Sequence, residues 1–202
     1  MISLNIADYQ PQKRYEYVLA SNGLFLIKSN DVFRAIVPVG PEELKLQPMT
    51  ETLELIGTIR VPFVWVHRAV EFFREVNRRY RAEAFLLILL DQASDQITLG
   101  CPKQDNSLSH VHAEPDSDIP DDLLRIGDIH SHPCTAFHSA GDVEDELGAD
   151  GIHVVVGNLQ LPVPQFTASL VVKGRRKPLA PADVLELDFE FDLAWLDKVN
   201  VQ

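Results

Sequence analysis

The sequence has 202 residues, 46% of them hydrophobic, and a formal net charge of -12. This size and hydrophobic content allow one sizeable core with a small appended unit. The acidic balance argues against a broad basic surface for nucleic acid or for an anionic membrane. Two cysteines exclude a disulfide scaffold and favour a reducing cytoplasm. The longest apolar run, residues 84–90, is far below the roughly 18 residues of a membrane helix, so we expect a cytoplasmic protein without a membrane span.

The first part of the chain, residues 1–56, alternates short apolar runs with turn sequences. The runs cover residues 15–19, 24–27 and 32–39, and the turns between them contain Asn, Gly, Ser and Asp. This pattern predicts strands joined by tight turns. We interpret residues 1–56 as a small β-rich extension without a chemical motif.

Residues 57–180 show the pattern of an α/β domain. Pro62 begins an amphipathic helix that ends near Tyr80, and Glu83 then precedes the apolar run 84–90, which suits a buried strand. A shorter strand is expected at 97–99, and the polar stretch 103–122 is interpreted as a long loop.

The second half of this domain is predicted to contain three more strands and one helix. The strands cover 123–129, 152–156 and 166–172, the helix covers 140–147, and the basic run 173–177 suits an exposed hairpin turn. Residues 181–202 are interpreted as an acidic tail that packs on the domain. A capping pattern at 183–186 conflicts there with the alternation of 185–191, which favours a half-buried strand. The sequence therefore predicts a mixed β-sheet flanked by helices.

The pattern His-x-His at the end of a predicted strand carries the first chemical signal. Residues two apart in a strand project to the same face, so His130 and His132 can present two imidazoles to one metal ion. Asp142, near the start of the next helix, could add a carboxylate. This set of two histidines and one aspartate leaves one position open, as a catalytic zinc requires.

Two further groups would complete a hydrolytic site. Zinc lowers the pKa of a bound water molecule to about 7. A carboxylate could then act as general base, and a hydroxyl could stabilise the oxyanion. Glu83 and Ser139 fit these two roles.

The residues 127–133, followed by Ser139-Ala140-Gly141-Asp142, resemble the JAMM motif of the JAB/MPN metallopeptidase family, and Glu83 resembles that family's upstream glutamate. The resemblance covers about residues 60–175. It implies a cytidine-deaminase-like fold, Zn²⁺ held by His130, His132 and Asp142, Glu83 as base and Ser139 as oxyanion donor. It also implies cleavage of a peptide or isopeptide bond, in some relatives on ubiquitin-like or sulfur-carrier proteins.

One departure from the family motif concerns Ser139. Six residues separate His132 from Ser139, where the family has seven. This contraction puts the placement of Ser139 in doubt more than that of Asp142.

A narrower resemblance links the extension, the stretch 151–159 and the acidic tail to the PRTRC system protein A family of bacterial plasmids and mobile elements. It implies a partner enzyme of the ubiquitin-activating, adenylating type. The oligomeric state is not indicated by the sequence.

Several alternatives stay open at this point. A non-catalytic MPN-like scaffold that binds a partner protein is the main one, and hydrolysis of a small non-peptide amide is another. Glu71 and Glu75 compete with Glu83, while Asp128 could orient an imidazole. His110 and His112 form a second His-x-His, which we interpret as part of a solvated loop.

Overall fold

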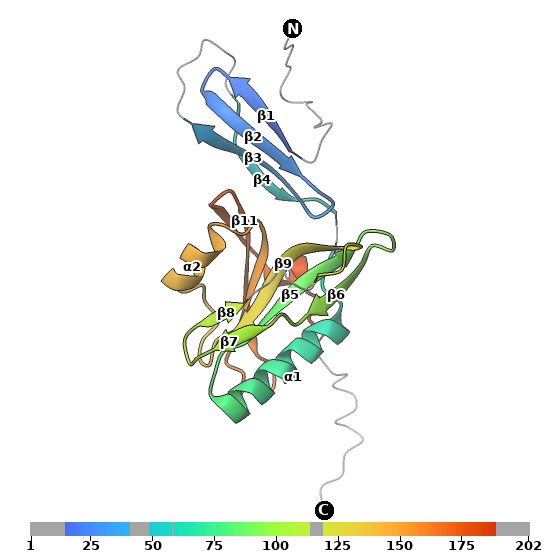
Figure 1. Cartoon of the computed structure of the whole chain (residues 1–202), viewed down its shortest axis with the longest axis vertical. Helices are drawn as coiled ribbons and strands as arrows, with labels where there is room; N and C mark the ends of the chain where they lie inside the picture. Colours follow the sequence, from blue (N-terminus) through green and yellow to red (C-terminus); the bar gives the residue numbers. More distant parts are fainter. Residues whose placement is uncertain (1–14, 41–48, 58, 114–118, 189–202) are drawn as a thin grey trace, which may run out of the picture.

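The computed structural model describes residues 15–40, 49–57, 59–113 and 119–188. In this part of the chain the strands form three sheets, accompanied by three helices (Figure 1). The four-stranded sheet has the order β1 (Tyr15–Ala20), β2 (Gly23–Ser29), β3 (Phe33–Gly40), β4 (Thr52–Leu55). The six-stranded sheet has the order β12 (Arg175–Leu179), β11 (Gln165–Val172), β10 (Gly151–Gly157), β9 (Leu123–Ser131), β5 (Phe85–Asp91), β6 (Gln96–Gly100). The two-stranded sheet pairs β7 (Gln104–Asn106) with β8 (Val111–Ala113), and the helices are α1 (Phe63–Tyr80), α2 (Ala140–Glu146) and α3 (Pro181–Val184).

The six-stranded sheet is mixed, because β9 and β10 run parallel while every other pair of adjacent strands in this sheet is antiparallel. The predicted α/β class is therefore confirmed at this coarse level. The parallel pair needs a long crossover connection, and α2 lies in that connection.

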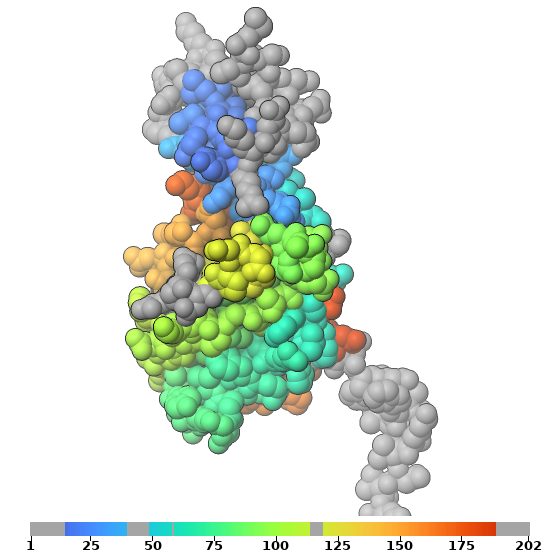
Figure 2. All heavy atoms as spheres, turned by 45° about the vertical axis from the view of Figure 1, so that its right-hand side comes forward, coloured from blue at the N-terminus to red at the C-terminus, as the bar shows by residue number. Residues whose placement is uncertain are grey.

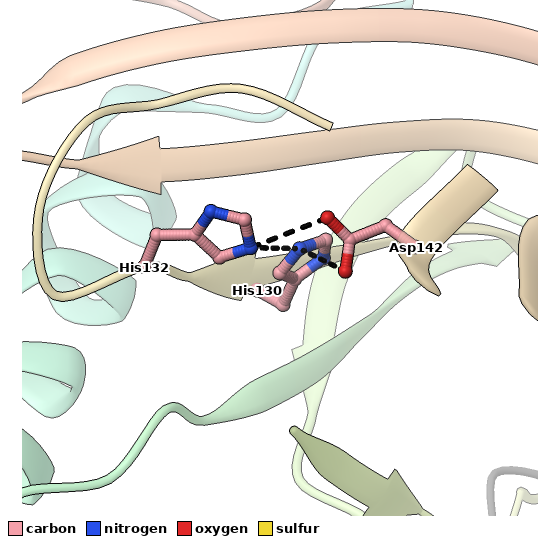
Figure 3. Close-up of side chains that lie close together, drawn as sticks. All are labelled: His130, His132 and Asp142. Atoms are coloured by element: carbon pink, nitrogen blue, oxygen red, sulfur yellow. Dashed lines mark hydrogen bonds and ion pairs between the residues drawn. The ribbon is translucent and has the colours of Figure 1, made fainter. Parts of the chain in front are cut away.

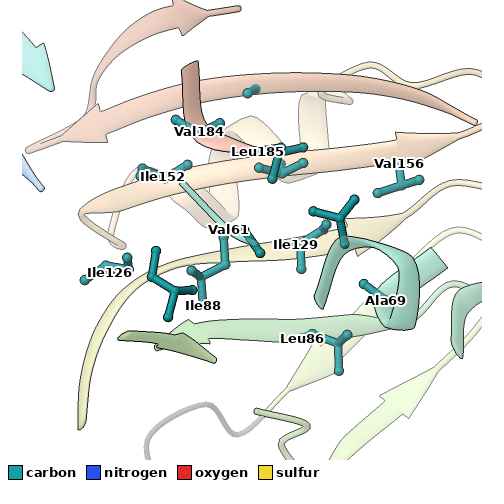
Figure 4. Packing of buried hydrophobic residues seen from close by; sticks show 14 of the residues in the cluster. Val61, Ala69, Leu86, Ile88, Ile126, Ile129, Ile152, Val156, Val184 and Leu185 are labelled. Carbon is teal, nitrogen blue, oxygen red and sulfur yellow. The ribbon is translucent and has the colours of Figure 1, made fainter. Parts of the chain in front are cut away.

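The amphipathic helix α1 covers the apolar face of this sheet. Its buried side chains belong to the same core cluster as Leu86 of β5, Ile129 of β9 and Val154 of β10 (Figure 4). These three strand residues are register partners, so they share one face. The apolar members on α1 are Val66, Ala69, Val70, Phe73 and Val76. Among the described residues, no helix is long and apolar enough to cross a membrane.

The N-terminal sheet β1–β4 falls within the predicted β-rich extension and has buried apolar residues on both faces. One face adds residues such as Phe33 and Val37 to the main core cluster, and the other forms a small cluster around Phe25 and Ile27. Polar contacts also join the two sheets, since Lys177 Nζ donates to the carbonyl of Leu53 at 2.9 Å. Figure 2 shows this sheet in blue at one end of the molecule, with α1 in blue-green at the other end.

Most predicted elements of the central part are confirmed with small changes of their ends. The basic run forms the tight turn between β11 and β12, where Lys173 and Gly174 both have positive φ, 52° and 70°. Positive φ at both central positions is the geometry of a type I′ hairpin turn.

The predicted loop 103–122 differs from the structure, because it contains the hairpin β7–β8. The Gln104 side chain explains how so short and polar a strand is held: its amide bonds both the N–H and the carbonyl of Phe85, at 2.9 and 3.0 Å. These side-chain bonds to the start of β5 substitute for an apolar pattern, which the sequence lacks here.

The strand predicted at 185–191 is wrong for its described residues, and 189–191 lie outside them. Pro181 begins the short helix α3, and Leu185 then makes only an isolated bridge with Val61. The carboxylate of Glu186 accepts a hydrogen bond from Phe63 N at 3.1 Å, at the beginning of α1. The carboxylate therefore accepts a hydrogen bond from the first turn of the helix, and its negative charge interacts favourably with the positive end of the helix dipole.

Burial of α1 predicts a matched pair of aromatic substitutions. Phe73 is fully buried, whereas Tyr80 on the same helix is 70% exposed. We expect Phe73→Ala to lower the free energy of unfolding by about 3–5 kcal/mol, because it removes apolar burial and leaves a cavity. Tyr80→Ala should change it by no more than about 0.5 kcal/mol. Chemical denaturation measures both, and equal effects would contradict this assignment of the core.

Candidate metal centre

The side chains of His130, His132 and Asp142 converge in the structure (Figure 3). The two Nε2 atoms lie 3.3 Å apart. His132 Nε2 lies 3.3 Å from Asp142 Oδ2, and His130 Nε2 lies 3.6 Å from Asp142 Oδ1. Both histidines are buried and Asp142 is half-buried. The three residues that the sequence analysis selected therefore share a common point.

With one ligand atom from each residue, the three atoms lie within 4.8 Å of one another, and the 3.3 Å between the two Nε2 atoms suits a tetrahedral metal ion. With zinc bonds near 2.0–2.1 Å, neighbouring ligand atoms of a tetrahedron lie about 3.3 Å apart. The donor set of two imidazoles and one carboxylate is one that zinc uses in catalytic sites. The residues present therefore fit a single divalent ion with a fourth position left over.

The end of β9 fixes both histidines through its neighbours. Between them, Ser131 turns away and bonds Ala84 twice: its N–H donates to the Ala84 carbonyl at 2.9 Å, and its hydroxyl accepts from Ala84 N at 3.0 Å. The N–H of His132 donates to the carbonyl of Val156 at 2.8 Å. The imidazoles therefore leave the sheet from a backbone that is held on both sides.

Gly157 lets the segment after His132 pass close to β10. A Cβ atom at Gly157 would lie 2.1 Å from the backbone nitrogen of Ala136. Only a residue without a side chain permits this approach, so Gly157 helps to set the path from His132 to α2.

Helix α2 carries Asp142 in its first turn, behind a capping box. Ser139 Oγ accepts from Asp142 N at 3.1 Å, and Asp142 Oδ2 accepts from Ser139 N at 2.5 Å. These reciprocal bonds satisfy helix N–H groups and orient the carboxylate. Burial opposes the charge on Asp142, but hydrogen bonds from His130 and His132 keep its pKa well below the usual value.

Glu83 lies next to this group with only 7% of its surface exposed. Its backbone is held by the β7–β8 hairpin, since its N–H donates to Ser107 and its carbonyl accepts from Asn106 Nδ2, both at 2.8 Å. Burial raises the pKa of the Glu83 carboxyl, and the nearby imidazoles of His132 and His130 offset part of this rise. A raised pKa suits a group that exchanges protons near neutral pH.

The competing carboxylates on α1 are placed differently. Glu71 pairs with Arg74 and Glu75 pairs with Arg78, each at 2.7 Å on the exposed face of the helix. Both carboxylates therefore form ion pairs at the surface of α1.

A cavity of about 300 Å³ joins Glu83, His130 and Asp142. One wall comes from the hairpin and includes His110 and His112, so these exposed histidines face the same space as the candidate ligands. Its described lining does not include His132 or Ser139. The further lining residues are Phe85, Val111, Ala113, Arg125, Asp128, Asp145, Glu146, Ala149 and His153.

Asp128 contacts a different imidazole from those of the metal centre. It binds His153 Nδ1 at 3.1 Å and Arg125 at 3.1 Å, and His153 Nε2 reaches the carbonyl of Ala149 at 2.9 Å. The structure thus places a buried polar network beside the candidate ligands. The sequence analysis did not single out Arg125 or Glu146, which is also buried.

No family model and no curated protein matches the chain. Among solved structures, a protein of Desulfitobacterium hafniense determined in solution is similar over 66% of this chain and 95% of its own, at 16% identity and a TM-score of 0.41.

The convergence of the three side chains predicts that they bind a metal ion. The second His-x-His provides a matched control. We expect the purified protein to retain a single equivalent of zinc and His132→Asn to lose it, because two ligands with open positions bind zinc weakly. His112→Asn, a matched change in the exposed second His-x-His, should retain the zinc. Metal content after gel filtration, measured by mass spectrometry, tests this. Retention of zinc by His132→Asn would place the metal elsewhere, and loss from both variants would show that the effect is not specific to His132.

Proposed function

We propose that this protein is a zinc-dependent hydrolase of the JAMM type that cleaves a peptide or isopeptide bond. The observation that carries the proposal is the convergence of His130, His132 and Asp142 beside a cavity that His130 and Asp142 line together with the buried Glu83. Zinc ligands with one open position, beside a carboxylate of raised pKa, are the groups that amide hydrolysis by water requires.

Glu83 is the general base of this proposal. Zinc bound to the three ligands would supply a water molecule of lowered pKa and polarise the substrate carbonyl. Glu83 then accepts the proton of the attacking water and delivers it to the leaving amine. Because the pKa of Glu83 is raised, the base is lost as the pH falls through that value, so activity declines on the acidic side.

Ser139 is proposed to donate a hydrogen bond to the developing oxyanion. Its hydroxyl accepts from Asp142 N and keeps its own proton available. The connection from His132 to Ser139 is one residue shorter than in the family motif, and Ser139 lies outside the described cavity lining.

The proposal has three further parts, which rest on the resemblance of residues 127–142 to the JAMM motif. They are a JAB/MPN-like fold, a peptide or ubiquitin-like protein as substrate, and an adenylating enzyme as partner. The arrangement of a mixed sheet with a strand that ends in His-x-His is compatible with them. A scaffold that binds partners without turnover is the competing function. It predicts that the wild-type protein itself has no hydrolytic activity.

Replacement of Glu83 by Gln separates these functions. We expect Glu83→Gln to keep zinc and to lower kcat by about 10²–10⁴-fold, because the amide preserves shape but cannot accept the proton. Glu75→Gln, the same change on the exposed face of α1, should leave kcat unchanged. Release of the C-terminal tail from ubiquitin-like fusion proteins is the assay. Equal turnover by wild type and Glu83→Gln would reject Glu83 as the base, and zinc binding without any turnover would favour the scaffold.

Substitution of Ser139 distinguishes its two roles. If Ser139 donates to the oxyanion, Ser139→Ala lowers kcat by about 10²–10³-fold at saturating zinc. Ser139→Thr, which keeps the hydroxyl, should retain most of the activity and the helix cap. A cap without a catalytic role predicts instead that Ser139→Ala weakens zinc binding, while kcat with saturating zinc stays near that of wild type.

A further inference from the structure

Helix α2, which carries Asp142, is attached to the protein in an unusual way. Its only buried side chain is the acidic Glu146, 6% exposed. The apolar Val143 on the same helix and Leu147 after it are 37% and 51% exposed. A surface helix ordinarily packs through an apolar stripe. The position of α2 therefore depends on polar contacts.

These contacts form a clamp around the Glu146 carboxylate, which we define as Glu146, His138 and Arg176. Glu146 pairs with the guanidinium of Arg176 on β12, and its other oxygen lies 3.2 Å from His138 Nδ1. Arg176 is itself fixed to the sheet by Ser169 Oγ at 2.5 Å. Burial opposes ionisation of Glu146, but hydrogen bonds from His138 and Arg176 lower its pKa, so the carboxylate is charged in the clamp.

The clamp and the metal centre share one face of α2. Asp142 and Glu146 are four residues apart, so they lie one above the other on the helix, and both line the cavity. His138 directly precedes the N-cap Ser139, so its contact with Glu146 links the two ends of this seven-residue helix. The capping box fixes the first turn, and the clamp fixes the last turn to β12.

We propose that Glu146 is a positioning residue, which holds α2 against β12 so that the Asp142 carboxylate meets His130 and His132. This inference rests on the proposed metal site but not on its catalytic activity. Groups that orient metal ligands change metal affinity by 10–100-fold when they are removed. Glu146 acts through Asp142 and needs no contact with the ion.

A double-mutant cycle on zinc affinity tests this inference. We expect Glu146→Gln to weaken zinc binding by about 10–100-fold in competition with a chelator. Glu144→Gln, the same change at an exposed position of α2, should alter it by no more than about twofold. In an Asp142→Asn background, Glu146→Gln should change the affinity by less than about threefold, because the ligand that it positions is already removed.

The outcomes that overturn the inference are distinct. Equal losses from Glu146→Gln in both backgrounds would show a general effect on stability, and a loss no larger than that of Glu144→Gln would show no role. If Glu146→Gln does not fold, Arg176→Lys takes its place in the same cycle. Losses of zinc affinity that add to that of Asp142→Asn would again show a general effect on stability. A wild-type protein without zinc would reject both the clamp and the proposed function, whereas zinc binding without turnover would reject the function alone.

Discussion

The register of β9 between β5 and β10 is the constraint on which the candidate site depends. His130 lies opposite Phe85 on one side and Val155 on the other, while Ile129 faces the apolar core. A shift by one residue would exchange these faces and bury the imidazoles against α1. The two hydrogen bonds between Ser131 and Ala84 oppose such a shift, because the Ser131 hydroxyl meets the N–H of Ala84 only in the observed register.

The two faces of the six-stranded sheet are stabilised by different forces. One face is an apolar core with α1, and the other combines buried apolar residues such as Leu87 and Val155 with the buried Asp128 of β9 and Glu146 of α2. A buried carboxylate destabilises the fold unless it is paired, and each of these two has a partner from another strand, His153 for Asp128 and Arg176 for Glu146. On this second face the apolar side chains contribute to stability, and the ion pairs fix the geometry of the carboxylates.

Local patterns in the sequence were sufficient to predict the apolar elements and to select the three side chains that converge, those of His130, His132 and Asp142. The helical period on α1, the continuous apolar run that forms β5 and the two-residue spacing of the histidines at the end of β9 are each visible in a short stretch of sequence. The hairpin β7–β8 has no such period, because Gln104 holds it through side-chain bonds to Phe85. The contact of Glu186 with the beginning of α1 and the burial of Glu146 at the end of α2 were also missed. A glutamate that ends up as a cap or in a buried ion pair has the same local sequence as one in solvent, and only tertiary structure separates the two.

The arrangement of α2 has a consequence for how metal binding and folding would depend on each other. The imidazole nitrogens of His130 and His132 and the carboxylate oxygens of Asp142 lie 3.3 to 3.6 Å apart. On the proposed function a divalent ion binds between them, so its binding free energy adds to the stability of the folded state. Because α2 buries only one side chain, a charged one, the ligand Asp142 would itself become an anchor of the helix once it binds the ion. Metal binding would then add to the anchoring that the capping box and the clamp already give to α2.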